Sequence, residues 1–243
     1  MSTSEAPPTP QPPPPEATSQ KPYERKFSFP QRIFKVLVSP REGKEDVALA
    51  PSYGEVFGIL AIQMFASFVI IALVFSKIQF VGVPPTVWII LTFASAIGVV
   101  FAYGFLVAIW LIESAIVKFA CNKVSGWDLK TAASITGYTY LVNILLSIIS
   151  MIVFWHFIPS IVIDVKNLEL TQQTIATLKA QLNWLWLCLL PVSLFGIIWK
   201  SHLGGLGVNF GTGGKRPQKL GFTVFFCIGL VGLLISVISN ILG

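Results

Sequence analysis

The sequence is poor in charge, in cysteine and in histidine, and each shortage excludes a class of protein. Only 12% of the 243 residues are charged, about half of the usual share in soluble domains, so an ordinary soluble domain is excluded. The three cysteines, Cys121, Cys188 and Cys227, lie too far apart for a metal or redox motif. The sequence has only two histidines, and it shows neither paired carboxylates nor a nucleophile–base pattern, so it offers no candidate catalytic group. We therefore predict a protein that is not an enzyme and has neither cofactor nor metal.

Long apolar runs take the place of charge. Hydrophobic residues make up 54% of the chain and gather in runs of about 20, the length that crosses a bilayer as a helix. We predict an all-α integral membrane protein, a bundle of five transmembrane helices within residues 54–243. The predicted spans are 54–76, 86–112, 132–158, 182–199 and 220–242. A capping-box pattern at Ser52 and Glu55 marks the start of the first span. Whether the helix of the second span continues to Lys118 is left open. We expect Pro191 to kink the fourth span.

Basic residues are unequally divided among the segments between these spans. Of the 17 Lys and Arg residues, 14 lie before the first span or in the second and fourth loops, and three lie in the first and third loops. The positive-inside rule then predicts a cytoplasmic N-terminus and a C-terminus outside. The membrane would be the cell membrane in a prokaryote and the ER or Golgi membrane in a eukaryote.

The 53 residues before the first span divide into two parts. Residues 1–26 are Pro-rich, with a run at 12–15, and we predict a disordered cytoplasmic tail; its PxxP repeats leave docking to an aromatic groove as an alternative. Residues 27–53 mix basic and apolar side chains, including Ile33, Phe34 and Leu37 on one side of a helical turn. We predict a basic amphipathic juxtamembrane segment on the lipid headgroups, ended by Pro40, with a plain charged linker as the alternative.

The net charge of +6 falls mostly on the predicted cytoplasmic side. It predicts contact with anionic lipid headgroups and protein partners rather than with nucleic acid. The glycine-rich stretch 204–216 fails as a phosphate-binding loop, since Asn209 stands at a required glycine, and we predict a flexible basic loop over 201–219. The candidate partner or lipid contacts are Arg32, Lys35, Arg41, Lys123, Lys130, Lys215, Arg216 and Lys219.

A few polar residues interrupt the apolar spans. Glu113 ends the second span and is a candidate either for ion passage or for a structural role at the membrane interface. Gln63, Asn143, Asn183 and His156 are scattered, so we expect interhelical hydrogen bonds from them. Small residues spaced by four, such as Ala94, Gly98 and Ala102, favour close helix packing, and a homo-oligomer stays open.

Three stretches carry a family resemblance. They are VLVSPREGKE, with Pro40, Arg41 and Glu42; the start of the third span, with Gly126, Trp127, Ser134, Gly137 and Tyr138; and the end of the fourth, with Gly196, Trp199, Lys200 and His202. Over about residues 30–242 the chain resembles the Yip family, five-span membrane proteins that in eukaryotes interact with Rab/Ypt-type GTPases. The acidic, Leu-rich segment of the eukaryotic trafficking branch is missing before the first span, so the chain looks more like the prokaryotic branch.

These patterns lead to two functional hypotheses. The first is a membrane scaffold or adaptor whose cytoplasmic face is built from 25–50, 118–131 and 200–219; a GTPase partner is implied by the resemblance alone. The alternative is a small transporter or channel for an ion or small solute that uses Glu113 and the Pro191-kinked span.

Overall fold

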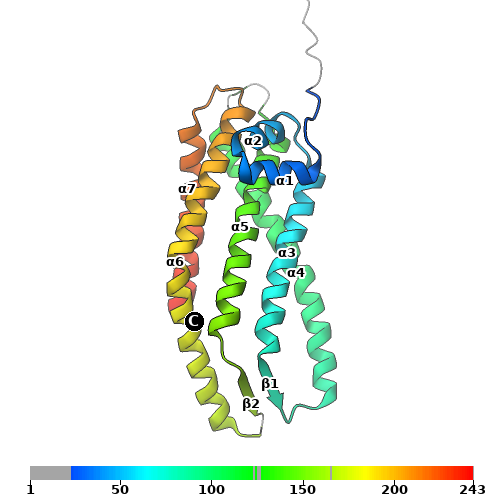
Figure 1. Ribbon diagram of the computed structural model, residues 1–243, viewed down its shortest axis with the longest axis vertical. Helices are drawn as coiled ribbons and strands as arrows, with labels where there is room; N and C mark the ends of the chain where they lie inside the picture. The colour runs from blue at the N-terminus through cyan, green and yellow to red at the C-terminus, as the bar shows by residue number, and fades with distance from the viewer. Residues whose placement is uncertain (1–22, 123, 125–126, 165, 243) are drawn as a thin grey trace, which may run out of the picture.

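The computed structural model describes residues 23–122, 124, 127–164 and 166–242. Five long helices form an elongated bundle, with two short helices across one end and two short strands at the other (Figure 1). We call the end with the short helices the cap end and the opposite end the ribbon end. In chain order the elements are α1 (Phe29–Val38), α2 (Pro40–Leu49), α3 (Tyr53–Ser76), β1 (Ile78–Val81), α4 (Pro85–Ala120), α5 (Leu129–Phe157), β2 (Ile161–Asp164), α6 (Leu168–Gly211) and α7 (Gln218–Leu242).

In the described part of the chain, five helices are long and apolar enough to cross a membrane: α3, α4, α5, α6 and α7. The prediction of five such helices is confirmed. α3 has 24 residues and is about 36 Å long, enough for a hydrocarbon core of about 30 Å. α4 and α6 have 36 and 44 residues, so at about 54 and 66 Å they extend well beyond that thickness. α4 continues past Lys118, the extension that the sequence left open.

The predicted loop over 201–219 is mostly wrong, because α6 continues as helix to Gly211. Glycines let it pack closely against its neighbours. A Cβ on Gly207 would lie 2.4 Å from Ile135 of α5, and one on Gly204 would lie 2.1 Å from Phe225 of α7. The glycine-rich composition therefore serves close helix packing in this stretch, and only residues 212–217 connect α6 to α7.

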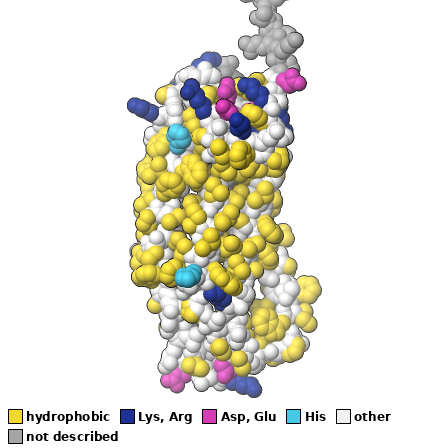
Figure 2. Space-filling model, viewed as in Figure 1, with side chains coloured by type: hydrophobic (Ala, Val, Ile, Leu, Met, Phe, Trp, Pro, Cys, Tyr) yellow, Lys and Arg dark blue, Asp and Glu magenta, His cyan; other side chains and the backbone are white. Residues whose placement is uncertain are grey.

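Most of the buried core lies toward the cap end, and a smaller buried cluster of Ile158, Ile161 and Leu185 lies at the ribbon end. At the cap end α3, α4, α5 and α6 pack together around Ile59, Trp110, Tyr138 and Leu203. Toward the ribbon end the same helices expose large apolar side chains. On the face shown in Figure 2, charged side chains gather mainly at the two ends, with a broad hydrophobic band between them. The exposed residues include Phe65, Phe93, Phe101, Ile152, Phe195 and Leu234.

A short parallel ribbon joins the two connections at the ribbon end. β1 pairs with β2 over four residues, with Ile78 opposite Ile161 and Val81 opposite Asp164. It ties the α3–α4 connection to the α5–α6 connection. These strands were not predicted from the sequence, because runs of four residues next to apolar spans carry no separate periodic signal.

The segment predicted to lie on the headgroups folds into α1 and α2, which together we call the cap. Pro40 stands at the first position of α2 and separates the two helices. The apolar face expected to enter lipid is divided: Ile33 and Leu37 pack on the buried core, while Phe34 is 62% exposed. The Pro-rich tail is predicted for residues 1–26, and residues 1–22 lie outside the described part.

Candidate functional site

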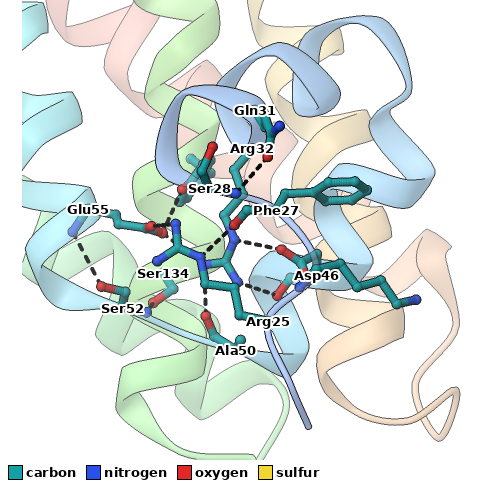
Figure 3. Close-up of polar contacts among 12 residues, drawn as sticks. Arg25, Phe27, Ser28, Gln31, Arg32, Asp46, Ala50, Ser52, Glu55 and Ser134 are labelled. Atoms are coloured by element: carbon teal, nitrogen blue, oxygen red, sulfur yellow. Dashed lines mark hydrogen bonds and ion pairs between the residues drawn. The ribbon is translucent and has the colours of Figure 1, made fainter.

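A buried arginine on α1 holds the cap on the bundle. The Arg32 Nε donates to Asp46 Oδ2 of α2 at 2.6 Å, and its Nη1 donates to Glu55 Oε2 of α3 at 2.8 Å (Figure 3). The same guanidinium also donates to the carbonyl oxygens of Ala50 at 2.9 Å and Asp46 at 3.1 Å. Arg32 is fully buried. One side chain therefore links α1, α2 and α3 through charge-assisted hydrogen bonds, the strong kind in proteins.

Both carboxylates have further partners. Tyr138 of α5 donates its hydroxyl to Glu55 Oε2 at 2.7 Å, and the other oxygen of Glu55 faces Arg25 in an ion pair. Asp46 Oδ1 accepts from the Lys26 amide at 2.9 Å and from the Tyr23 hydroxyl at 3.1 Å. The segment before α1 is thereby held over the same two carboxylates. We call this set the Arg32 network: Tyr23, Arg25, Lys26, Arg32, Asp46, Glu55 and Tyr138.

The network favours the charged forms of its members in the cap. Burial alone raises the pKa of Asp46, but the Lys26 amide and the Arg32 guanidinium outweigh it and leave the pKa below its usual value. Burial lowers the pKa of Arg32, and hydrogen bonds to Asp46 and Glu55 outweigh that and raise it. The docked cap therefore holds ionised partners, and separating one from the others would leave an uncompensated buried charge.

A second cation of the cap, Lys44 on α2, is also fully buried. Its Nζ donates to the Ile135 carbonyl oxygen of α5 at 2.9 Å and lies 6.0 Å from the centre of the Tyr138 ring. The amine thus meets a carbonyl oxygen rather than a carboxylate. Burial, and then repulsion from Lys200, hold the pKa of Lys44 well below its usual value. Lys44 joins the cap to α5 without a buried ion pair.

Glu113 forms an ion pair between two of the long helices. Both of its oxygens lie 3.2 Å from Lys200 Nζ of α6, and the two side chains are 11% and 12% exposed. Lys200 also lies 4.5 Å from the centre of the Tyr140 ring on α5. This pair, across 87 residues of the chain, was not predicted from the sequence. The charge of Glu113 is therefore compensated where it lies.

Two glycines allow the backbones at this end to approach closely. A Cβ on Gly43 of α2 would lie 2.5 Å from the Val36 nitrogen of α1, and one on Gly137 of α5 would lie 2.2 Å from Val56 of α3. Separations under about 3 Å are not tolerated by real side chains, so glycine is needed at both crossings. Gly137, singled out by the family resemblance, thus has a structural reason to be glycine.

The prediction that Arg32 contacts lipid or a partner is wrong, because two carboxylates and two carbonyl oxygens enclose its guanidinium. Arg216 is half-buried and donates to the Asn122 carbonyl oxygen at 3.1 Å. Lys35 is partly exposed and pairs with exposed Glu42 at 2.6 Å. The remaining candidates on the described surface are exposed: Arg41, Lys130, Lys215 and Lys219. Lys123 and Gly126 lie outside the described residues.

The intramembrane polar candidates lie at different levels of the bundle. The predicted interhelical hydrogen bond of Gln63 is confirmed: its Nε2 donates to Ser147 Oγ of α5 at 3.2 Å. Asn143 is half-buried on α5 and is not a member of the Arg32 network. Within the described residues, no group of three or more His, Cys, Asp or Glu residues is placed to hold a metal ion.

The three stretches of the family resemblance meet at the cap end. Lys44 of the first stretch contacts Ile135, which lies within the second, and is repelled by Lys200 of the third. Comparison of the chain with protein families, with curated proteins and with solved structures finds no match. The Yip resemblance therefore stays a prediction. In chemical terms, the site is a set of paired charges that fixes two helices on a bundle.

Proposed function

We propose that the five long helices cross a lipid bilayer, with the N-terminus cytoplasmic and the C-terminus outside. Two features support this placement. The apolar side chains exposed between the two ends would be costly in water but not in lipid. The distribution of Lys and Arg along the sequence favours the cap end as the cytoplasmic side.

At this cytoplasmic side, the cap is the docking face of a non-enzymatic scaffold or adaptor. The observation that carries this proposal is a cap, docked by the Arg32 network, that exposes apolar side chains next to charged ones. Phe34 and Val38, four residues apart on α1, are each 62% exposed, with Lys35 and Arg41 beside them in the sequence. Because the Arg32 network already fixes α1, docking of a partner costs little conformational entropy in the cap. The chemistry suits a protein with an apolar patch and an acidic rim, or anionic lipid headgroups.

The experiment is site-specific photo-crosslinking in native membranes. p-Benzoylphenylalanine replaces Phe34 in one variant and Phe65, which is 68% exposed in the apolar band, in another. We expect Phe34 to yield one discrete protein adduct, and Phe65 to yield lipid. The adduct should fall sharply when Arg32→Met loosens the cap. Lipid alone from both positions would refute the adaptor proposal and leave only a lipid-binding role for the cap.

The transporter or channel alternative rests on the Glu113–Lys200 pair. A carboxylate and an amine that pair between two helices can in principle exchange their partner for an ion or a proton. The compensated charge of Glu113 favours the structural role. A liposome flux assay distinguishes the two functions, because a scaffold moves no solute.

A further inference from the structure

A groove runs along one face of α6 at the ribbon end. Its lining residues on α6 recur every three or four positions and so lie on one face of the helix. Two adjoining hollows of about 480 and 320 Å³ share Thr177 and Gln181 and so form one groove. The opposite wall is formed by Phe157 and by residues 159–162, at the start of β2. We call it the α6 groove; on α6 it is lined by Leu170, Gln173, Thr174, Thr177, Leu178, Ala180, Gln181, Trp184 and Leu185.

The two halves of the groove differ in chemistry. Near the ribbon it offers the amides of Gln173 and Gln181 and the hydroxyl oxygens of Thr174 and Thr177. The Thr174 and Thr177 hydroxyls donate to helix carbonyl oxygens at 2.8 and 3.0 Å, which leaves their oxygens as acceptors. Every described lining residue is uncharged. This half can exchange neutral hydrogen bonds but cannot neutralise a charge.

The other half of the groove is apolar. It is lined by Phe157, Trp184 and Leu185, and the Phe157 and Trp184 rings lie 6.5 Å apart between centroids. Trp184 is 58% exposed and Phe157 55% exposed. Exposed tryptophan is typical of the level at which hydrocarbon meets headgroups. The polar half is the part of α6 that precedes the apolar span, so the groove crosses this level.

We propose that the α6 groove binds a membrane lipid with an uncharged headgroup that carries several hydroxyl groups, such as a sugar-bearing diacylglycerol. The headgroup lies against the Gln and Thr half, and an acyl chain follows Phe157, Trp184 and Leu185. A charged headgroup would lose hydration without gaining an opposite charge, which is unfavourable. Hydroxyl groups both donate and accept, so they match amides and threonine oxygens. The volume lies in the range of ligand sites, roughly 300–1,000 Å³. This inference rests on the proposed membrane placement and not on the adaptor role.

The test uses tryptophan fluorescence in phosphatidylcholine vesicles. The protein has seven tryptophans, so the difference between the wild-type protein and Trp184→Phe isolates the signal of Trp184. Three lipids with the same brominated chains, which quench nearby tryptophan, are added at equal mole fraction: monogalactosyl diacylglycerol, phosphatidylglycerol and phosphatidylcholine. We expect the galactolipid to be enriched about threefold at Trp184, which corresponds to roughly 0.7 kcal/mol, one modest net hydrogen bond.

Matched variants locate the preference. Gln181→Glu places a negative charge in the groove and should abolish the enrichment, whereas Gln172→Glu adds the same charge on α6 outside the lining and should retain it. Gln173→Ala, which adds no charge, should weaken it. Equal quenching by all three lipids would overturn the proposal, because ordinary surrounding lipid explains it. Preferential quenching by phosphatidylglycerol would also overturn it. No quenching of Trp184 by any lipid would overturn it together with the membrane placement.

Discussion

Replacing Arg32 with methionine should release the cap from the bundle. Methionine replaces the aliphatic part of the arginine side chain but removes the cation that faces Asp46 at 2.6 Å and Glu55 at 2.8 Å. Removing one partner of a buried ion pair costs roughly 3–5 kcal/mol, mainly because the other charge stays buried and unpaired. Arg25 still faces Glu55, so we take the lower end, about 3 kcal/mol. At 1.4 kcal/mol for each factor of ten, the docked fraction relative to the open fraction falls about 100-fold.

Hydrogen–deuterium exchange on the intact protein in nanodiscs measures this equilibrium. Amides of α1 and α2 exchange when the cap opens, so their protection should fall about 100-fold in Arg32→Met, as the opening free energy falls. The part of α5 nearest the ribbon end should keep its protection. Restriction of the change to residues 29–49 would identify the event as cap opening rather than global unfolding.

Two further variants test the physical reason. Lys35→Met breaks the exposed Lys35–Glu42 pair and should leave exchange unchanged, because solvent screens that pair. The double variant Arg32→Met with Asp46→Leu should lose less protection than Arg32→Met alone, since it removes one of the stranded carboxylates. A change below about threefold in Arg32→Met, under 0.7 kcal/mol, would refute the reasoning, as would an equal loss in Lys35→Met.

Four other outcomes are expected. Cap docking should weaken in acid, because the folded pKa of Asp46 lies below 3.8: its charge stabilises the fold above that pH, and this contribution is lost as the pH falls through the folded pKa. Limited proteolysis across pH should show the weakening, and Asp46→Asn should remove this pH dependence. Docking should strengthen as the pH rises toward 10.5, because the Lys44 amine binds more protons when the cap is open and the amine is exposed than when it is buried. Lys44→Met should remove this dependence. Gly137→Ala should cost about 1–3 kcal/mol in thermal unfolding by overpacking, whereas Gly98→Ala, whose Cβ meets nothing within 4 Å, should be neutral or stabilising by up to about 1 kcal/mol. Glu113→Gln should leave crosslinking from Phe34 intact, and a solute flux in liposomes that this variant abolishes would favour the transporter.

The long helices were predictable because hydropathy is summed over a window, so single polar residues such as Gln63 and Asn183 do not change the result. The end of α6 was not, because the meaning of its glycines is not local. Taken alone, residues 204–214 indicate a flexible chain. In the fold, Gly204 and Gly207 lie against side chains of two other helices, and that packing keeps the stretch helical. Local propensity was overridden by contacts that no short window contains.

The Arg32 network was missed for a related reason: counting charges along a chain treats every lysine and arginine as exposed. The spacing carried a signal, because Arg32 lies four residues before the apolar Val36 and so shares a helix face with it. In the fold both side chains are fully buried. Within the part of the chain that the structure describes, three of the 14 basic residues on the predicted cytoplasmic side are buried or nearly so: Arg32, Lys44 and Lys200. Without them 11 remain against three, so the predicted orientation still follows. The expected binding energy to anionic lipid falls more, because a basic residue contributes about 1 kcal/mol only if it reaches the lipid surface. Among the predicted lipid contacts that the structure describes, Lys35, Arg41, Lys130, Lys215 and Lys219 remain exposed or partly exposed.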